Sequence, residues 1–242
     1  MVLSFKTNYE GDHEVTFHVF SDQTEKISEL KNVLKNTDIV HHKIPAYGWP
    51  DATLLRYEVI SEAYKILNED ILVHIDADMI FEGNPVDLFR AVINEKMLFV
   101  QHPGFYRPHG RIEKVKYYFS FRSLIRDLYL IISNGGIGAW EKRKASSAYI
   151  PRKFRRQYFC GAVWAGKNRV VKEFCLEASR RTKKDLSNNL VARWHDESHL
   201  NRYAINHPII FLDPRFCFDE TYPQLKKLNP VIVAVDKSIQ QD

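Results

Sequence analysis

Short apolar runs alternate with helical patterns along the first part of the chain. Strands are predicted at 15–20, 71–75 and 97–101. Helices are predicted at 25–35, 52–68 and 85–95. Such alternation is typical of an α/β fold with an open, mostly parallel central sheet and helices on both faces. After residue 160 the order is less regular. Helices are expected at 168–182 and 196–206, and short strands near 209–212 and 230–235.

An acidic pair, Asp76 and Asp78, directly follows the predicted strand 71–75. In α/β folds ligands bind at the carboxyl ends of the strands, so the pair stands where a ligand is expected. Two carboxylates this close can hold one hard cation such as Mn²⁺ or Mg²⁺, which would bridge the phosphates of a bound nucleotide. Asp-X-Asp triplets also occur in turns and at helix starts, so the prediction depends on the place after the strand.

Size and composition limit the class of protein. The 242 residues suffice for one large α/β domain or two small ones, and 45% hydrophobic residues predict a full core. Cys160, Cys175 and Cys217 are scattered, which argues against a disulfide framework or zinc ribbon and favours a reducing compartment. The first residues lack a secretory apolar region, and no stretch reaches the roughly 18–20 apolar residues of a membrane span. A cytoplasmic location is therefore expected.

A longer match points to a family. The segment in question is Trp194-His195-Asp196-Glu197-Ser198-His199-Leu200-Asn201-Arg202-Tyr203. It resembles the signature of glycosyltransferase family 6, which includes the blood-group A and B transferases and α-1,3-galactosyltransferases. Four further blocks follow the family's order: Gly48-Trp49-Pro50-Asp51 with Arg56, His102-Pro103-Gly104-Phe105-Tyr106, Ser147-Ala148-Tyr149-Ile150-Pro151, and Tyr158-Phe159-Cys160-Gly161-Ala162 with Gly166.

The resemblance implies one glycosyltransferase domain over residues 1–242, with a Rossmann-like nucleotide-sugar transferase fold of the GT-A type. It implies transfer of galactose or N-acetylgalactosamine from a UDP-sugar, in α-1,3 linkage and with retention, to a β-galactoside or glycolipid acceptor. Mn²⁺, with Mg²⁺ as the other candidate, is the implied cofactor, and no nucleic-acid partner is implied. The lack of a signal-anchor pattern is typical of a bacterial or phage member.

The resemblance also assigns roles to residues. Glu197 would be the nucleophile beside the anomeric carbon, and Asp196 would hydrogen-bond the donor sugar. Asp76 and Asp78 would hold the metal against the diphosphate. The other donor contacts would be Arg56, Cys160, Gly161, Ala162 and Lys237, and the acceptor contacts would be His102, Trp194 and Asp219. Adjacent acids on a helix point about 100° apart, so they can take different roles; acids in a first helical turn are also ordinary dipole compensation.

Three features qualify this interpretation. Ala162 favours galactose, because its methyl group fills space that an acetamido group needs, although the small Cys160 restores some room. The family's first strand and its Thr-Gly loop for uracil are not matched, since 15–20 already resembles the second strand. The same acids would also suit a non-catalytic carbohydrate- or nucleotide-binding domain, or a metal-dependent hydrolase.

Residues 107–144 form an extended basic insertion relative to the family, in a chain whose net charge is only +5. Within it, residues 112–133 have the pattern of a basic amphipathic helix. Such a helix can rest on an anionic membrane that carries a lipid-linked acceptor, which would make the protein peripheral on the inner membrane face. The alternatives are a helix packed on the domain, a self-association surface or a solvated basic face.

Overall fold

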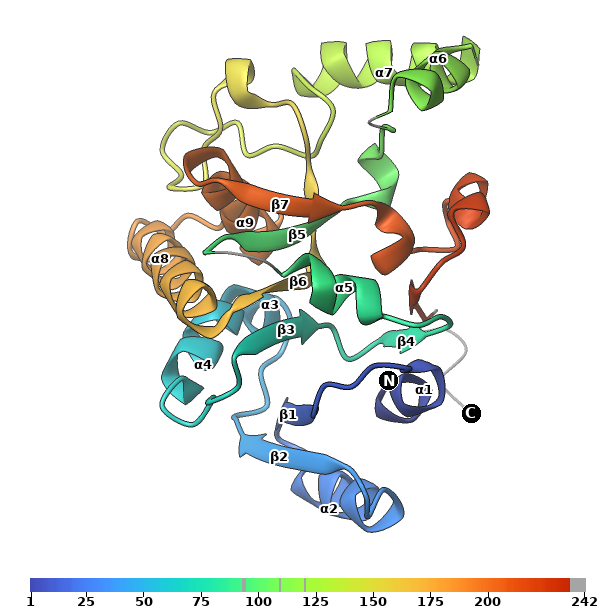
Figure 1. Ribbon diagram of the computed structural model, residues 1–242. Coiled ribbons are helices and arrows are strands. Elements are labelled where there is room, and N and C mark those ends of the chain that lie inside the picture. The colour runs from blue at the N-terminus through green and yellow to red at the C-terminus, as the bar shows by residue number, and fades with distance from the viewer. Residues whose placement is uncertain (93–94, 109, 120, 236–242) are drawn as a thin grey trace.

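The computed structural model describes residues 1–92, 95–108, 110–119 and 121–235 and shows an α/β fold (Figure 1). The helices, in chain order, are α1 (Val2–Asn8), α2 (Thr24–Val33), α3 (Asp51–Leu54), α4 (Arg56–Ala63), α5 (Val86–Ala91), α6 (Arg111–Tyr118), α7 (Phe121–Asn134), α8 (Asn168–Ser187) and α9 (His195–Asn206). The strands are β1 (Thr16–Ser21), β2 (Asp38–Lys43), β3 (Ile71–Ile75), β4 (Met79–Phe81), β5 (Met97–Gln101), β6 (Phe159–Lys167), β7 (Ile209–Leu212) and β8 (Ile232–Ala234). Short 3-10 helices, η1 to η4, cover Pro103–Phe105, Arg152–Phe154, Pro214–Phe216 and Pro223–Leu228.

The predicted order of elements is confirmed for most of the chain. β3 and β5 lie at the predicted 71–75 and 97–101, and α8 and α9 begin within one residue of their predicted starts. The single helix predicted at 52–68 is instead two short helices, α3 and α4, which meet at Leu55. The sequence patterns did not predict α1, β2, β4 or β6.

The central sheet has the strand order β3-β6-β5-β7. β6 is antiparallel to both β3 and β5, whereas β5 and β7 are parallel. The α/β class is confirmed, but the sheet is mixed rather than mostly parallel, because β6 returns between two strands that share one direction. β1 and β2 form a separate parallel pair, and β4 pairs with β8 in antiparallel orientation.

Helices cover both faces of the central sheet, as the alternation predicts (Figure 1). On one face, α4, α8 and α9 bury Tyr57, Phe174 and Leu200 against the strands. On the other face, α1 and α5 contribute Phe5 and Leu88 to a second buried cluster. Full burial of one such side chain contributes about 1.5–3 kcal/mol. The sheet is therefore held from both sides, and the loops at its edge are positioned by a packed scaffold.

The basic insertion contains α6 and α7, which lie at one end of the molecule, away from β1 and β2 (Figure 1). Both helices present many apolar side chains to the outside. Across the described ranges, no helix combines the length and the apolar character that crossing a bilayer requires.

Candidate active site

The acidic pair lies on the turn between β3 and β4. The N–H of Asp76 extends the β3–β6 pairing by donating to the carbonyl of Ala162 at 3.0 Å. The carbonyl of Asp78 accepts from the N–H of Val235 at 2.8 Å, which ties the turn to the residue after β8. Both aspartates are half-buried. The backbone thus fixes the pair at the end of a strand in the central sheet, where the sequence places it.

Arg56, the first residue of α4, joins the acidic pair to the start of α9. Its guanidinium contacts Oδ1 of Asp76 at 2.9 Å and Oδ2 of Asp196 at 2.8 Å. It also donates to the carbonyl of Gly161 at 3.1 Å. Burial would lower the pKa of Arg56, but the charges of Asp196 and Asp76 outweigh burial and raise that pKa above its ordinary value. A permanently charged arginine therefore gathers two acids from distant parts of the chain.

His74 is a member of this cluster that the sequence analysis missed. Its Nε2 lies 3.1 Å from Oδ1 of Asp76, and its ring stacks on Trp164 with the centroids 4.6 Å apart. Burial would raise the pKa of Asp76, but the contacts with His74 and Arg56 lower it below its usual range. Asp76 is therefore ionised at neutral pH. The signal was the spacing, because residues two apart on a strand share a face.

Glu197 extends from the first turn of α9 toward β6. The N–H of Gly161 donates to its Oε2 at 2.9 Å, and the hydroxyl of Tyr158 lies nearby. Glu197 keeps some exposed surface, yet protein atoms crowd its carboxylate. Burial therefore raises its pKa to about 7, although Tyr158 and the N–H of Gly161 act to lower it. Burial likewise raises the pKa of Asp196 to about 6, which Arg56 partly opposes. The surroundings of both carboxylates therefore disfavour their charged form.

Two hydrogen-bonded contacts fix the orientation of α9. At its start, the N–H of Trp194 donates to Oγ of Ser198 at 2.9 Å. Further along, the side chain of Asn201 accepts from the N–H of Phe159 at 2.9 Å and donates to its carbonyl at 2.8 Å. Because the amide of Asn201 pairs with the backbone of β6, the helix cannot turn without breaking two buried hydrogen bonds.

The three residues assigned to the donor sugar on β6 point to different sides of the strand. Gly161 faces α9, and a Cβ at this position would lie 3.1 Å from Oδ2 of Asp196, tighter than ordinary contact. Cys160 is buried in the opposite core cluster with Cys217, and Ala162 packs against the same cluster. Gly161 is thus part of the acidic site itself, while its two neighbours support the strand from behind.

The residues assigned to the acceptor differ in how deeply they are buried. The ring of His102, which follows β5, is 5.8 Å from that of Tyr158, and the hydroxyl of Tyr158 lies near Glu197. Burial lowers the pKa of His102 to about 4, while nearby Asp219 acts to raise it. The neutral ring accepts from the N–H of Gly104 at 3.0 Å. Trp194 is 49% exposed at the start of α9. These acceptor roles stay predictions, and Lys237 lies outside the described residues.

The acidic pair can hold a metal only with help from a ligand. Among the described residues, no group of three or more His, Cys, Asp or Glu side chains could hold a metal ion. Hard cations such as Mg²⁺ often bind through one or two carboxylates, with substrate phosphates and water completing the shell. Within the described part of the chain, Arg56 and His74 both contact Oδ1 of Asp76, which leaves its Oδ2 for a cation. Asp76 and Asp78 therefore fit a metal shared with a bound diphosphate.

An α/β scaffold with acids gathered at a strand end and on a facing helix is consistent with a GT-A-like fold. The model of glycosyltransferase family 6 matches residues 127–241. Histo-blood group ABO system transferase 2 of Rattus norvegicus is 30% identical over 94% of this chain and 61% of its own length. Over these stretches the chain is similar to members of glycosyltransferase family 6.

Two other relatives have names that describe different glycosyltransferase activities. Globoside alpha-1,3-N-acetylgalactosaminyltransferase 1 of Gallus gallus is 25% identical over 98% of this chain and 62% of its own length. The O-antigen biosynthesis glycosyltransferase WbnI of Escherichia coli is 25% identical over 93% of this chain and 82% of its own. The chain thus spans less than two thirds of the rat and chicken relatives.

Proposed function

We propose that this protein is a retaining glycosyltransferase that moves galactose, or N-acetylgalactosamine, from a UDP-sugar in α-1,3 linkage to a β-galactoside acceptor. The observation that supports this most is the convergence of four separate segments on one small site. Arg56 of α4 contacts both Asp76 and Asp196, while Gly161 of β6 hydrogen-bonds Glu197. A donor diphosphate at the acidic pair would lie beside the two acids of α9.

Each of these residues has a task in the proposed reaction. Asp76 and Asp78 would hold Mn²⁺ or Mg²⁺, and the metal would neutralise charge on the departing diphosphate. Asp196 would accept a hydrogen bond from a sugar hydroxyl, since its Oδ2 is held by Arg56 at 2.8 Å. Glu197 would face the anomeric carbon, where a carboxylate can attack or stabilise an oxocarbenium-like centre. The hydrogen bond from the N–H of Gly161 would keep that carboxylate in place.

The acceptor would bind on the side of Glu197 where His102 lies. The neutral ring of His102 can hydrogen-bond a sugar hydroxyl, and the half-exposed Trp194 offers a flat apolar face for sugar C–H groups. Galactose is favoured as the donor sugar by the family resemblance at Ala162, not by a contact of its methyl group with the acidic site. Since Ala162 packs against the core cluster behind β6, its effect on the donor would include the position of the strand itself.

Product formation tests this function directly. The protein is incubated with Mn²⁺, UDP-galactose or UDP-N-acetylgalactosamine, and a panel of β-galactosides, and the expected result is an elongated product with an α-1,3 bond. Exhaustive chelation should abolish turnover, and added Mn²⁺ should restore it. UDP release without product would indicate a hydrolase, and donor binding without turnover would indicate a non-catalytic binding domain. Either result would overturn the proposal.

We also propose that α6 and α7 rest on an anionic membrane, which would place the enzyme beside a glycolipid acceptor at a cytoplasmic membrane face. The orientation of α7 supports this. Its side toward the protein is polar: Asp127 is buried, and Arg126 pairs with it at 2.9 Å and donates to the carbonyl of Tyr106 at 3.2 Å. Its outward side is apolar, with Phe121, Leu124, Ile125, Leu128, Tyr129, Ile131 and Ile132 all exposed. Ordinary surface helices have the opposite orientation.

The charges beside this apolar face favour anionic lipid as its occupant. Exposed basic side chains on the two helices are Arg111, Lys114, Lys116 and Arg122, against one exposed acid, Glu113. Phe119, between the helices, is 90% exposed. Basic residues beside a row of exposed apolar ones are typical of helices that lie in a membrane interface. A second copy of the same cationic face would repel the first.

Vesicle sedimentation tests the membrane proposal. The protein should pellet with phosphatidylcholine vesicles that contain phosphatidylglycerol and much less with phosphatidylcholine alone. Serine at both Phe121 and Ile132 should weaken binding about tenfold or more, because two large apolar side chains no longer enter the lipid. Val33→Ser, equally exposed but on α2, is the matched control and should change nothing. Unchanged vesicle binding after deletion of residues 112–133 would reject the proposal. It would also be rejected if the protein bound no vesicles and the deletion instead broke a dimer, because the apolar face would then be a self-association surface.

A further inference from the structure

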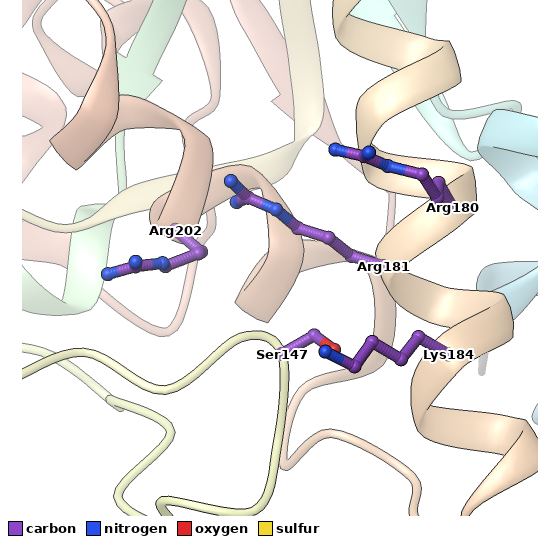
Figure 2. Close-up of a pocket in the computed structure, with 5 residues that line it drawn as sticks. All are labelled: Ser147, Arg180, Arg181, Lys184 and Arg202. Carbon is purple, nitrogen blue, oxygen red and sulfur yellow. The ribbon is translucent and has the colours of Figure 1, made fainter.

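A cavity of about 330 Å³ lies between α8, α9 and the segment that carries Ser147. The residues that line it are Ser147, Arg180, Arg181, Lys184 and Arg202 (Figure 2). Arg181 extends from α8 toward α9, and the ammonium group of Lys184 points toward Ser147 (Figure 2). None of these residues is a member of the acidic site around Glu197, so the cavity is a separate feature of the fold.

The lining of this cavity is strongly positive. It contains three arginines and a lysine and no acid. Arg181 pairs with Glu177, but among the described residues no salt bridge joins Arg180, Lys184 or Arg202 to a carboxylate. Burial lowers the pKa of Arg181, and the nearby charges of Arg202 and Arg180 lower it further, against the opposing effect of Glu177. Three of the four cations that line the cavity therefore have no carboxylate in ion-pair contact within the described structure.

Two polar groups in the lining are buried without a hydrogen-bond partner in the described structure: Nη1 of Arg181 and Oγ of Ser147. The backbone N–H of Ser147 is already satisfied, since it donates to Asp185 at 2.6 Å. Buried donors are rarely left unpaired, because each loses its hydrogen bonds to water and gains none in exchange. Both groups thus have a hydrogen-bonding capacity that the described structure does not use.

We propose that the cavity binds a compact phosphate-bearing anion. Such an anion supplies several acceptor oxygens and at least one negative charge, which match an arginine fork, an ammonium group and a hydroxyl. The central contacts would be Arg181, Lys184, Arg202 and Ser147. Arg180 is the least committed member, since it also lines a neighbouring hollow with Glu58, Glu173 and Glu177. The shared chemistry allows a free phosphate or a lipid headgroup as the source.

Inorganic pyrophosphate is the probe for a free phosphate, with affinity measured by calorimetry at fixed ionic strength and with a chelator present. The chelator matters because a diphosphate at Asp76 and Asp78 would need a metal. Lys184→Gln and Arg202→Gln should each weaken binding about tenfold or more, since each removes a charged hydrogen-bond donor. Lys183→Gln is the matched control on the same helix: Lys183 pairs with Glu58 at 2.9 Å and lines the neighbouring hollow instead. It should bind as tightly as the unchanged protein.

A second arm replaces pyrophosphate with phosphatidylcholine vesicles that contain phosphatidic acid. Pyrophosphate binding that depends on Arg202 identifies a free phosphate as the ligand. Vesicle binding that depends on Arg202, without pyrophosphate binding, identifies a lipid headgroup. The proposal is overturned if neither probe binds, or if Lys183→Gln weakens binding as much as Arg202→Gln does. Because Arg202 and Lys184 lie outside the acidic site, both variants should retain metal-dependent binding of the donor, which separates this test from that of the proposed enzyme.

Discussion

α7 and α8 are both amphipathic helices with basic residues, and they face opposite ways. α8 buries Val170, Val171, Phe174, Cys175 and Ala178 toward the sheet and shows most of its arginines and lysines to the outside. α7 buries Asp127 toward the protein and shows phenylalanine, leucine and isoleucine side chains to the outside. The hydrophobic pattern of a helix shows which face is apolar. It does not show whether the domain or something else covers that face.

This difference separates two kinds of order in the molecule. Around α8 and α9, apolar burial fixes the backbone, and the backbone then fixes polar groups such as Glu197 and Arg181 at defined positions. Around α6 and α7 the buried contacts are mainly polar, with Arg126 linking Asp127 to the loop before the insertion. We therefore expect chemistry to depend on the α8–α9 side and attachment to depend on the hairpin, defined here as α6 and α7.

The largest effect is expected in catalysis. Glu197→Gln should reduce turnover by a thousandfold or so, because the amide can keep the hydrogen bond from Gly161 but cannot supply the negative charge that the anomeric centre needs. Donor binding should change little. The measurement is product formation with a soluble β-galactoside, alongside the donor dissociation constant.

Two controls connect this result to the comparison. Glu173→Gln removes an exposed carboxylate from α8 and should leave turnover unchanged. Serine at Phe121 and Ile132 should also leave turnover of a soluble acceptor unchanged. A large loss of turnover in the hairpin variant would mean that the hairpin contributes to catalysis as well as to attachment. Full activity of Glu197→Gln would remove Glu197 from the mechanism.

The next effect is on stability. Phe174→Ala in α8 should destabilise the protein by about 3–5 kcal/mol, since the side chain is fully buried and its removal leaves a cavity. Ile132→Ser in α7 should change the free energy of unfolding by no more than about 0.5 kcal/mol, because the side chain is 80% exposed. Urea unfolding without lipid measures both. A comparable loss of stability in the two variants would show that another surface already covers the apolar face of α7.

The hydrophobic patterns of single segments correctly predicted several individual helices and strands. The apolar run of β3 and the acids after it lie where expected, and so do α8 and α9. β6 could not be placed in this way, because its position between β3 and β5 depends on pairing between residues far apart in the chain. Nothing in a run such as Phe159-Cys160-Gly161 reveals the direction of its neighbours.

The same limit applies to the candidate site. Asp76, Asp196 and Glu197 were found by type and by resemblance, but their grouping depends on Arg56, whose three contacts lie on three different elements. The orientation of α7 was likewise out of reach, since a polar patch on the domain decides which face turns inward. Sequence patterns identify the parts well, while their assembly depends on long-range contacts that local spacing does not encode.

The smallest effect expected is a pH-dependent gain in stability from Glu197→Gln. Burial raises the pKa of Glu197 in the folded protein to about 7, from an ordinary 4.5, so between these values the folded state binds more protons than the unfolded state. Stability therefore falls as pH rises through this window. The variant should match the unchanged protein near pH 4.5 and exceed it by about 1–3 kcal/mol at pH 8, measured by urea unfolding without donor or metal. Glu173→Gln controls for charge loss at the surface of α8. A gain that is equal at both pH values would mean that packing, rather than the ionisation of Glu197, sets the difference.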